Sequence, residues 1–298
     1  MSKSSNSGSQ DSAVRGLVVV NKPRGITSRR ALDLVERRLE IGPLGHCGSL
    51  DPLATGVLVL VAGKARKIQD LVVRGEKVYE IVATLGARTT TDDAEGEMTV
   101  VDPAPEPPSE AEIEKALPSF RGEISQVPPT YSAVKVDGKR LHREARKGNP
   151  VQAKPRTVTV HELTLTKYEW PEVHLHMRCG SGTYARAIAR DLGEALGTGG
   201  YMSGLVRTHV GSLDLSMATP PEEVEAEHIL GIESALKNFP RLNVPLDQRH
   251  LLSRGQSLRT PPGFPIEEPC FAWVGGEVVA AVTFTNNGTK FRTRRLLV

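Results

Sequence analysis

The stretch Gly45-His-Cys-Gly-Ser-Leu-Asp-Pro-Leu-Ala-Thr-Gly-Val-Leu58 is the most informative part of this 298-residue chain. Glycine at positions 45 and 48 lets the backbone bend and approach a ligand closely. An Asp-Pro pair commonly starts a turn, and the apolar residues 57–61 that follow predict a buried strand. The stretch therefore predicts a turn that holds His46, Ser49 and Asp51 just before a strand, although an isolated Asp-Pro pair would indicate only a turn.

Hydrophobic periodicity on both sides of this turn predicts an α+β fold. In the predicted strand 77–85, Tyr79, Ile81 and Ala83 lie on one face, because side chains alternate along a strand. Ser28 is the predicted N-cap of the first helix. The predicted strands are 16–20, 57–61, 77–85, 157–168, 173–179 and 205–213, and the predicted helices are 28–40, 63–73, 111–117 and 184–196.

The end of the chain predicts a second, smaller β domain. Gly275-Gly276 and Asn286-Asn287-Gly288 are turn signals for two β-hairpins, and they follow a proline-rich region. We expect a disordered, serine-rich tail over residues 1–14, a main domain over 15–240, and a small β domain over 241–298.

Composition argues against several classes of protein. No segment approaches the roughly 18 consecutive apolar residues that a membrane span needs, and the polar tail resembles no secretory signal. We therefore expect a cytoplasmic protein without membrane contact. The 3 cysteines form no CxxC pair, so that neither a disulfide framework nor a zinc site is favoured.

Two short motifs leave alternatives open. Gly180-Ser-Gly-Thr-Tyr184 follows a predicted strand and opens a helix, but it lacks the third glycine of a dinucleotide-binding fingerprint. A nucleotide-dependent enzyme built on this turn is therefore the weaker alternative. His174 and His176 lie near Cys179, but no second group of ligands accompanies them, and we expect no metal.

Charge is distributed unevenly along the chain. The 38 Lys and Arg against 35 Asp and Glu give a net charge of +3. Residues 135–156 carry eight Lys or Arg and two acids, so that this segment alone has a charge of +6 and the remainder −3. Such a segment is either a solvated surface or a phosphate-binding one. The acidic residues 92–114 are interpreted as a solvated connection.

The motif around Asp51 closely resembles the catalytic-aspartate motif of the TruB family, the tRNA pseudouridine-55 synthases. Two positions depart from the family pattern: Cys47 replaces the more usual threonine, and Arg29 stands where many relatives have a small polar residue or histidine. The other family motifs have counterparts in order, namely Asn21-Lys22-Pro23 with Gly25 and Thr27-Ser28, Lys77-Val78-Tyr79 with Leu85-Gly86 and residues 89–93, residues 126–135 with Gly138-Lys139, Ser181-Gly182-Thr183-Tyr184 with Arg186 and residues 191–193, and Leu205 with Arg207-Thr208.

The resemblance implies an isomerase with the pseudouridine synthase fold, which has a mixed, mainly antiparallel sheet, and a PUA-like C-terminal domain. Its substrate would be a uridine in the T-arm of tRNA, whose N1–C1′ bond breaks before C5 is joined to C1′. Because the product is an isomer of the substrate, we expect no cofactor. Nothing in the sequence requires a protein partner or more than a monomer.

This reaction needs a carboxylate at the sugar, as glycosidases need one at an anomeric carbon. The resemblance assigns that role to Asp51, and whether it attacks C1′ or removes a ribose proton stays open. Arg186 would oppose the rise in pKa that burial causes in a carboxyl group. Tyr79 would stack on the base, and His46 would fill the space left by the extracted nucleotide.

RNA contacts are expected from Lys22, Tyr184 and an insertion around residues 124–156. An RNA chaperone that kept this fold and lost catalysis is the alternative, and the presence of the whole catalytic set argues against it. The expected phosphate-binding residues of the insertion are Lys135, Lys139, Arg140, Arg143, Arg146 and Lys147.

Replacing both Arg143 and Arg146 by Glu is expected to weaken tRNA binding, because each lost phosphate contact no longer releases counterions. Binding titrations over a series of salt concentrations should give a slope of log K against log salt that is shallower by roughly one to two. An unchanged slope would remove the phosphate-binding assignment from this segment.

Overall fold

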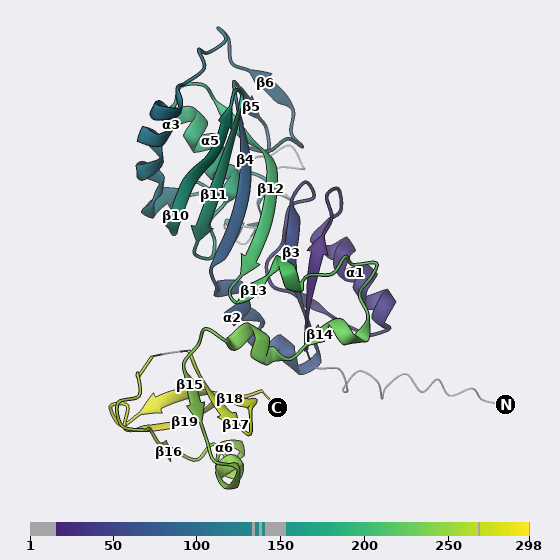
Figure 1. The fold of residues 1–298 in the computed structure, drawn as a ribbon, viewed down its shortest axis with the longest axis vertical. Coiled ribbons are helices and arrows are strands. Elements are labelled where there is room, and N and C mark those ends of the chain that lie inside the picture. Colours follow the sequence, from purple (N-terminus) through teal and green to yellow (C-terminus); the bar gives the residue numbers. More distant parts are fainter. Residues whose placement is uncertain (1–15, 133–134, 137–138, 141–152, 268, 298) are drawn as a thin grey trace, which may run out of the picture.

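The computed structural model describes residues 16–132, 135–136, 139–140, 153–267 and 269–297. The tail over residues 1–14 lies outside them. The described chain forms a large mixed sheet and a separate five-stranded sheet (Figure 1). The large sheet consists of β1 (Gly16–Lys22), β2 (Gly45–His46), β3 (Thr55–Ala62), β4 (Lys77–Leu85), β7 (Gly122–Gln126), β10 (Arg156–Glu169), β11 (Glu172–Cys179), β12 (Gly200–Val210), β13 (Leu213–Asp214) and β14 (Ile229–Leu230).

The strand order in the large sheet is β14-β1-β3-β12-β4-β11-β10-β7, with β2 paired to β3 and β13 paired to β12. β3 and β12 run parallel, whereas the other described pairs in this sheet are antiparallel. The predicted α+β fold with a mixed, mainly antiparallel sheet is confirmed. The predicted bounds 205–213 were wrong for one strand. β12 starts earlier, at Gly200 opposite Leu85, and ends before the turn at Gly211.

The helices begin largely where the sequence predicts, with two corrections. The N-cap of the first helix is Thr27, whose Oγ1 accepts a hydrogen bond from the amide of Arg30 at 3.1 Å. Ser28 is instead the first helical residue. The predicted helix 63–73 is a 3-10 helix followed by a short α-helix. The α-helices are α1 (Ser28–Leu39), α2 (Gln69–Arg74), α3 (Glu110–Ala116), α5 (Ala185–Ala195) and α6 (Arg249–Ser253) in the described residues, and the 3-10 helix before α2 is η1 (Gly63–Ile68).

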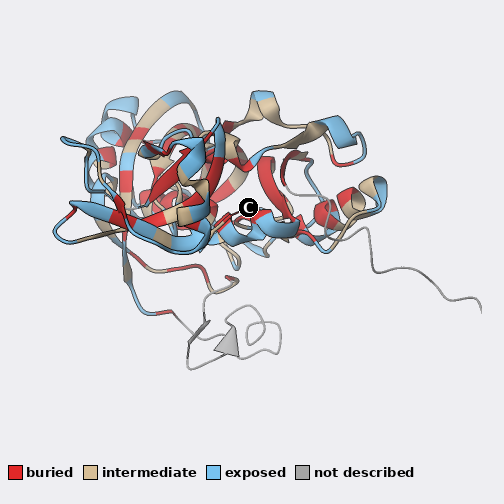
Figure 2. Cartoon of the chain, turned by 90° about the horizontal axis from the view of Figure 1, so that it is seen from below, coloured by how far each residue is buried: buried red, intermediate tan, exposed pale blue. Residues whose placement is uncertain are grey.

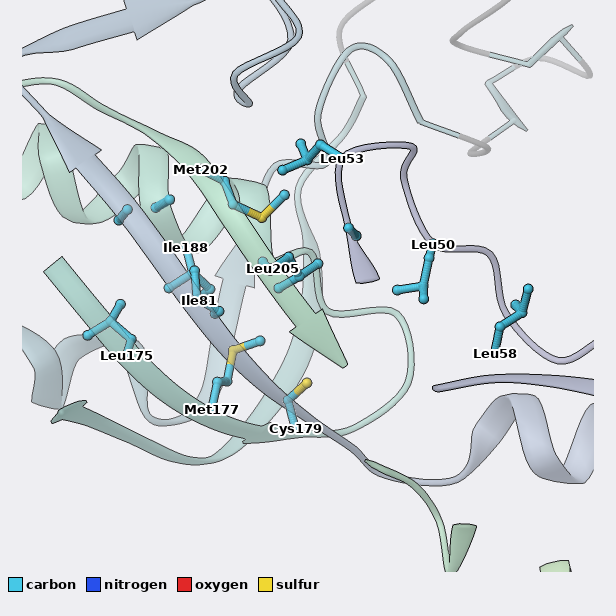
Figure 3. Packing of buried hydrophobic residues seen from close by; sticks show 14 of the residues in the cluster. Leu50, Leu53, Leu58, Ile81, Leu175, Met177, Cys179, Ile188, Met202 and Leu205 are labelled. Atoms are coloured by element: carbon cyan, nitrogen blue, oxygen red, sulfur yellow. The ribbon is translucent and has the colours of Figure 1, made fainter. Parts of the chain in front are cut away.

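The main core lies between α5 and the sheet. Ile81 of β4, Leu175 of β11 and Ile188 of α5 are almost fully buried in it, and Leu50 and Leu53 of the Asp51 turn pack in the same cluster (Figure 3). Figure 2 shows the buried residues gathered along the strands and the exposed ones on the outer helix faces and loops. The turn that carries Asp51 is therefore anchored to the core by its own leucines.

β3 is buried on both faces, which explains its continuous apolar sequence. Leu58 and Leu60 face the main core, whereas Val57, Val59 and Val61 face a second cluster. Phe271, Trp273 and Leu297 of the C-terminal sheet belong to that second cluster, so that both sheets share it.

The C-terminal sheet lies beyond α2, at the end of the molecule opposite β5 (Ala87–Thr89) and β6 (Met98–Val100) (Figure 1). Both predicted hairpins are present, at Gly275-Gly276 and at Asn286-Asn287-Gly288, and these residues have the positive φ values that such turns require. The strands of this sheet, in spatial order, are β15 (Arg241–Asn243), β17 (Cys270–Val274), β18 (Glu277–Thr285), β19 (Lys290–Leu296) and β16 (Leu258–Arg259).

No helix in the described ranges is long and apolar enough to cross a membrane.

Replacing Gly56 by Ala is expected to destabilise the fold strongly. Gly56 has a φ of 97°, and a Cβ there would lie 2.3 Å from the carbonyl oxygen of Arg207 on the neighbouring strand. The positive φ costs about 1–2 kcal/mol for an L-residue, and the overlap with the backbone adds roughly 1–3 kcal/mol. Urea denaturation would measure the free energy of unfolding.

Gly25→Ala is the matched control for this substitution. Gly25 has a φ of 88°, but a Cβ there would meet nothing within 4 Å, so that only the backbone strain is expected. Equal losses of stability in the two variants would show that the close approach of β3 and β12 is unimportant.

Candidate active site

Asp51 lies on the loop between β2 and β3, which hydrogen bonds from Ser28 and Gly25 hold in place. Ser28 accepts from the amide of Leu50 at 2.8 Å and donates to the Leu50 carbonyl at 3.0 Å. The amide of Gly25 donates to the Pro52 carbonyl at 2.8 Å. The loop is thus held by the segment between β1 and α1, and the backbone polar groups next to Asp51 are satisfied.

Arg186, in the first turn of α5, pairs with Asp51. Its Nε lies 3.1 Å from Oδ2 of Asp51, and its Nη2 donates to Oδ1 at 3.3 Å. The Arg186 side chain is 6% exposed and that of Asp51 is 37% exposed. The carboxylate therefore has a protein-facing side, which the guanidinium covers, and a side open to solvent.

The remaining N–H groups of Arg186 bind other parts of the chain. Nη1 donates to the carbonyl of Thr91 at 3.0 Å and lies 3.3 Å from Oδ2 of Asp93. Nη2 also donates to the carbonyl of Tyr131 at 3.0 Å. Arg186 therefore links the Asp51 loop to two further loops, each of which limits how the guanidinium can be oriented.

Gln126, at the end of β7, fixes the start of α5. Its Oε1 accepts from the amide of Tyr184 at 2.8 Å, and its Nε2 donates to the Tyr184 carbonyl at 3.1 Å. Gln126 is 1% exposed. This double contact holds the start of α5 two residues before Arg186. The sequence placed Gln126 in a family motif but did not predict this contact.

Burial raises the pKa of the Asp51 carboxyl, and the nearby Asp93 carboxylate raises it further. The positive charges of Arg186, Lys22 and Arg207 oppose this rise. Arg186 is the strongest of the three and the only one in direct contact with Asp51. Three cations therefore favour the ionised form of Asp51 against burial and the charge of Asp93, and the sequence predicted Arg186 as one of them.

The interpretation of residues 92–114 as a solvated acidic connection was wrong for Asp92 and Asp93. Asp93 is 3% exposed, and its Oδ1 accepts from Thr91 Oγ1 at 2.5 Å. Asp92 pairs with Arg190 of α5 at 2.8 Å. The sequence did contain a signal for burial of these two acids. They directly follow three threonines, whose hydroxyl groups can donate hydrogen bonds to a buried carboxylate.

Tyr79 and His46 border the same set of groups. Tyr79 lies on β4 directly opposite Arg207 of β12 in the sheet. Burial raises the pKa of Tyr79, and Arg207 opposes that rise. Burial also lowers the pKa of His46, with Arg207 and Arg29 lowering it further, so that its imidazole is neutral at pH 7.

The expectation that Lys22 binds a phosphate does not fit its position. Lys22 is 0% exposed. Its Nζ donates to the carbonyls of Pro23 and Ile26, each at 2.8 Å, and to that of Pro52 at 3.2 Å. The ammonium group therefore ties the first strand to the Asp51 loop, and burial lowers its pKa to about 8.

The basic insertion is described only in part. Lys135 pairs with Arg140, and Val136 with Lys139, in the short strands β8 (Lys135–Val136) and β9 (Lys139–Arg140). Arg143, Arg146 and Lys147 lie outside the described residues. At the edge of the insertion, the guanidinium of Arg156 lies 4.7 Å from the ring centroid of Tyr184.

The two histidines that the sequence places near Cys179 lie away from Asp51. His174 and His176 are on the solvent face of β11, where His176 Nδ1 is 2.7 Å from Glu80 and His174 Nε2 is 3.4 Å from Glu172. They are on the opposite face of the strand from Leu175 and Met177, which point into the main core.

Two protein-family models match the sequence. A family model described as the N-terminal domain of TruB family pseudouridylate synthase matches residues 36–185. The chain belongs to the TruB family. A second model, described as the C-terminal domain of tRNA pseudouridylate synthase B, matches residues 186–248.

Similar TruB family proteins cover nearly the whole chain. The tRNA pseudouridine synthase B of Pseudomonas fluorescens (strain Pf0-1) is 41% identical over 269 residues, which are 90% of this chain and 84% of that protein. The protein of the same name from Pseudomonas aeruginosa (strain UCBPP-PA14) is 37% identical over 96% of both chains.

Solved structures confirm the fold. A chain of a Cbf5-Nop10-Gar1 complex matches 95% of this chain and 85% of its own length, with a TM-score of 0.73 and 22% identity. A chain of an H/ACA ribonucleoprotein bound to a substrate RNA containing 2′-deoxyuridine covers the same shares with a TM-score of 0.72 and 20% identity. The predicted pseudouridine synthase fold is thus confirmed, together with a C-terminal β domain.

The buried position of Lys22 predicts an unusual titration. Its pKa of about 8, against an ordinary 10.5, should appear as a ¹³Cε chemical-shift midpoint near pH 8 in lysine-labelled protein. Because the unfolded lysine holds its proton to higher pH, this group makes the free energy of unfolding rise as pH increases from about 8 towards 10.5.

Two variants assign that signal. Lys22→Met should remove it, whereas Lys77→Met should remove a different one, since burial also lowers the pKa of Lys77 to about 8. A midpoint near 10.5 for Lys22 would mean that its ammonium is in solvent and free to meet a phosphate.

Proposed function

We propose that this protein converts the uridine at position 55, in the T-loop of tRNA, into pseudouridine, and that Asp51 is the carboxylate that acts at the sugar. The observation that carries this proposal is the contact between Asp51 and the buried Arg186, made by residues on two separate TruB family motifs. The relatives named tRNA pseudouridine synthase B support tRNA as the substrate.

In this reaction the N1–C1′ bond breaks while the detached base stays bound. The base then turns, C5 bonds to C1′, N1 gains a proton, and the hydrogen originally on C5 is released. Uridine and pseudouridine have the same composition, so the sequence of steps consumes no other reactant. The enzyme must supply an ionised carboxylate near C1′, and Arg186 opposes the rise in the Asp51 pKa that burial causes.

Tyr79 and His46 are assigned to the base. Tyr79 extends from the core face of β4, where its ring packs against the main core and the charge of Arg207 opposes the rise in its pKa. His46 stays neutral, because burial and two arginines lower its pKa. A neutral imidazole can occupy the space of an extracted base without carrying a charge into the stacked loop.

The charges around the site balance one another, so that the basic charge for an RNA ligand lies in the insertion. When all are ionised, the carboxylates of Asp51, Asp93 and Glu95 and the cations of Lys22, Arg186 and Arg207 give a net charge of zero. The basic insertion adds a charge of +6 over residues 135–156. Affinity for the phosphate backbone would come from the insertion, whereas the buried cations serve the carboxylate.

Several finer features belong to the same proposal. We assign the phosphate contacts to the basic insertion, a role at the RNA surface to Tyr184, and a PUA-like function to the C-terminal sheet. We propose that the protein acts as a monomer on tRNA in the cytoplasm. Lys22 is assigned to the support of the Asp51 loop, since its ammonium binds the Pro52 carbonyl.

Asp51→Asn is expected to abolish catalysis while tRNA binding persists. The amide is nearly isosteric but carries no negative charge to act at the sugar, so that hydrogen release from C5 should fall by at least about a thousandfold. The measurement is tritium release from [5-³H]uridine in unmodified tRNA, without added cofactor. Asp70→Asn, an exposed aspartate on α2, is the control and should leave the rate unchanged.

The same assays separate the alternatives. Wild-type protein that binds tRNA but releases no hydrogen from it would favour an RNA chaperone that has kept the fold. Saturable binding of a dinucleotide in a calorimetric titration would favour a nucleotide-dependent enzyme built on the turn at Gly180.

A further inference from the structure

Arg207 of β12 is a buried arginine that does not contact Asp51 directly. Its side chain is 2% exposed and is the largest among the fully buried side chains of the described residues. Its Nε donates to the Val57 carbonyl at 2.7 Å, and its Nη2 donates to the Gly48 carbonyl at 3.0 Å. Burying a guanidinium on carbonyl acceptors is costly, which indicates that its position has a use.

The strand register explains what Arg207 brings together. On β12 it lies opposite Tyr79 of β4 on one side and opposite Gly56 of β3 on the other. Its guanidinium reaches back to Gly48, three residues before Asp51, and its charge acts on the Tyr79 hydroxyl. One residue thus binds the loop that carries the carboxylate and lies beside the aromatic residue assigned to the base.

We propose that Arg207 is a positioning residue, which fixes the Asp51 loop relative to β4, where Tyr79 lies beside it, so that base and sugar meet their groups in one geometry. This inference rests on the proposed function. A planar guanidinium with several N–H donors can hold the Gly48 and Val57 carbonyls together, whereas a lysine ammonium at the end of a flexible stem cannot reproduce that fork.

The electrostatic surroundings agree with this role. The charge of Arg207 acts on titratable side chains of β1, β2, β4 and the Asp51 loop. It opposes the rise in the pKa of Asp51 and of Tyr79, and it adds to the lowering of the pKa of His46. The other titratable groups on which its charge acts are Lys22, Cys47 and Lys77.

Two substitutions separate geometry from charge. Arg207→Lys keeps the charge but loses the fork, and Arg207→Met loses both. We expect both variants to release tritium from [5-³H]uridine-labelled tRNA about 10- to 100-fold more slowly in single-turnover reactions. The dissociation constant for tRNA should change less than about twofold, because Arg207 is inside the protein and does not face a phosphate.

The pH dependence of the single-turnover rate gives a readout that a merely structural role would not move. The acid limb should shift to higher pH in Arg207→Met, since a cation that opposes the rise in the pKa of Asp51 is removed. It should stay in place in Arg207→Lys. The matched controls are Arg178→Lys and Arg178→Met on the solvent face of β11, where the arginine is 41% exposed and pairs with Glu76.

Other results would overturn the inference. A wild-type rate in Arg207→Lys would show that the fork is unnecessary, and an unshifted acid limb in Arg207→Met would show that Arg207 does not act on Asp51. Both rates are measured at a temperature where circular dichroism shows each variant folded. Failure of Arg207→Lys to fold even at low temperature would assign Arg207 to stability alone and would equally overturn it.

The wild-type control separates failure of the proposed function from failure of the proposed role of Arg207. No tritium release from wild-type protein would overturn the proposed function itself. Normal release from wild-type protein together with normal release from Arg207→Lys would overturn only the role of Arg207.

Discussion

The buried guanidinium of Arg186 is the constraint around which the site is arranged. A cation that is 6% exposed must find opposite charge and acceptors inside the protein, because removing one partner of a buried pair leaves an uncompensated charge that costs about 3–5 kcal/mol. Arg186 meets this requirement with the carboxylates of Asp51 and Asp93 and with two backbone carbonyls. The loops that carry these groups are therefore fixed by the same interaction that opposes the rise in the Asp51 pKa.

The strands of the large sheet hold the Asp51 loop in position. β3 follows the Asp51 loop directly and is buried on both faces, so that the loop cannot move without disturbing two hydrophobic clusters. The parallel pair of β3 and β12 brings Arg207 beneath the loop, and Lys22 reaches it from β1. Two buried cations thus bind loop carbonyls, while Arg186 binds the carboxylate itself. The three act on one loop from three different elements.

Much of the fold could be predicted from sequence because its signals are local. Alternation in strand 77–85 correctly placed Tyr79 and Ile81 on the same face, which the structure shows to be the core face, and the glycine and asparagine turns marked both C-terminal hairpins. The errors arose where tertiary contacts override local preference. Ser28 has the chemistry of an N-cap, but its hydroxyl is used by the Leu50 backbone, and Thr27 caps the helix instead.

By itself the sequence determined the six long strands of the large sheet, the Asp51 turn and the family motifs, since these depend on periodicity, glycine conformation and residue spacing along one chain. Only the tertiary structure decided which charges meet. Asp93 belongs to an acidic stretch that could equally be solvated, and Lys22 to a motif that could equally face RNA, yet both side chains are buried. A charged residue has the same local sequence whether it faces water or a partner, and the partner of Asp93 is Arg186, which folding brings from a distant part of the chain.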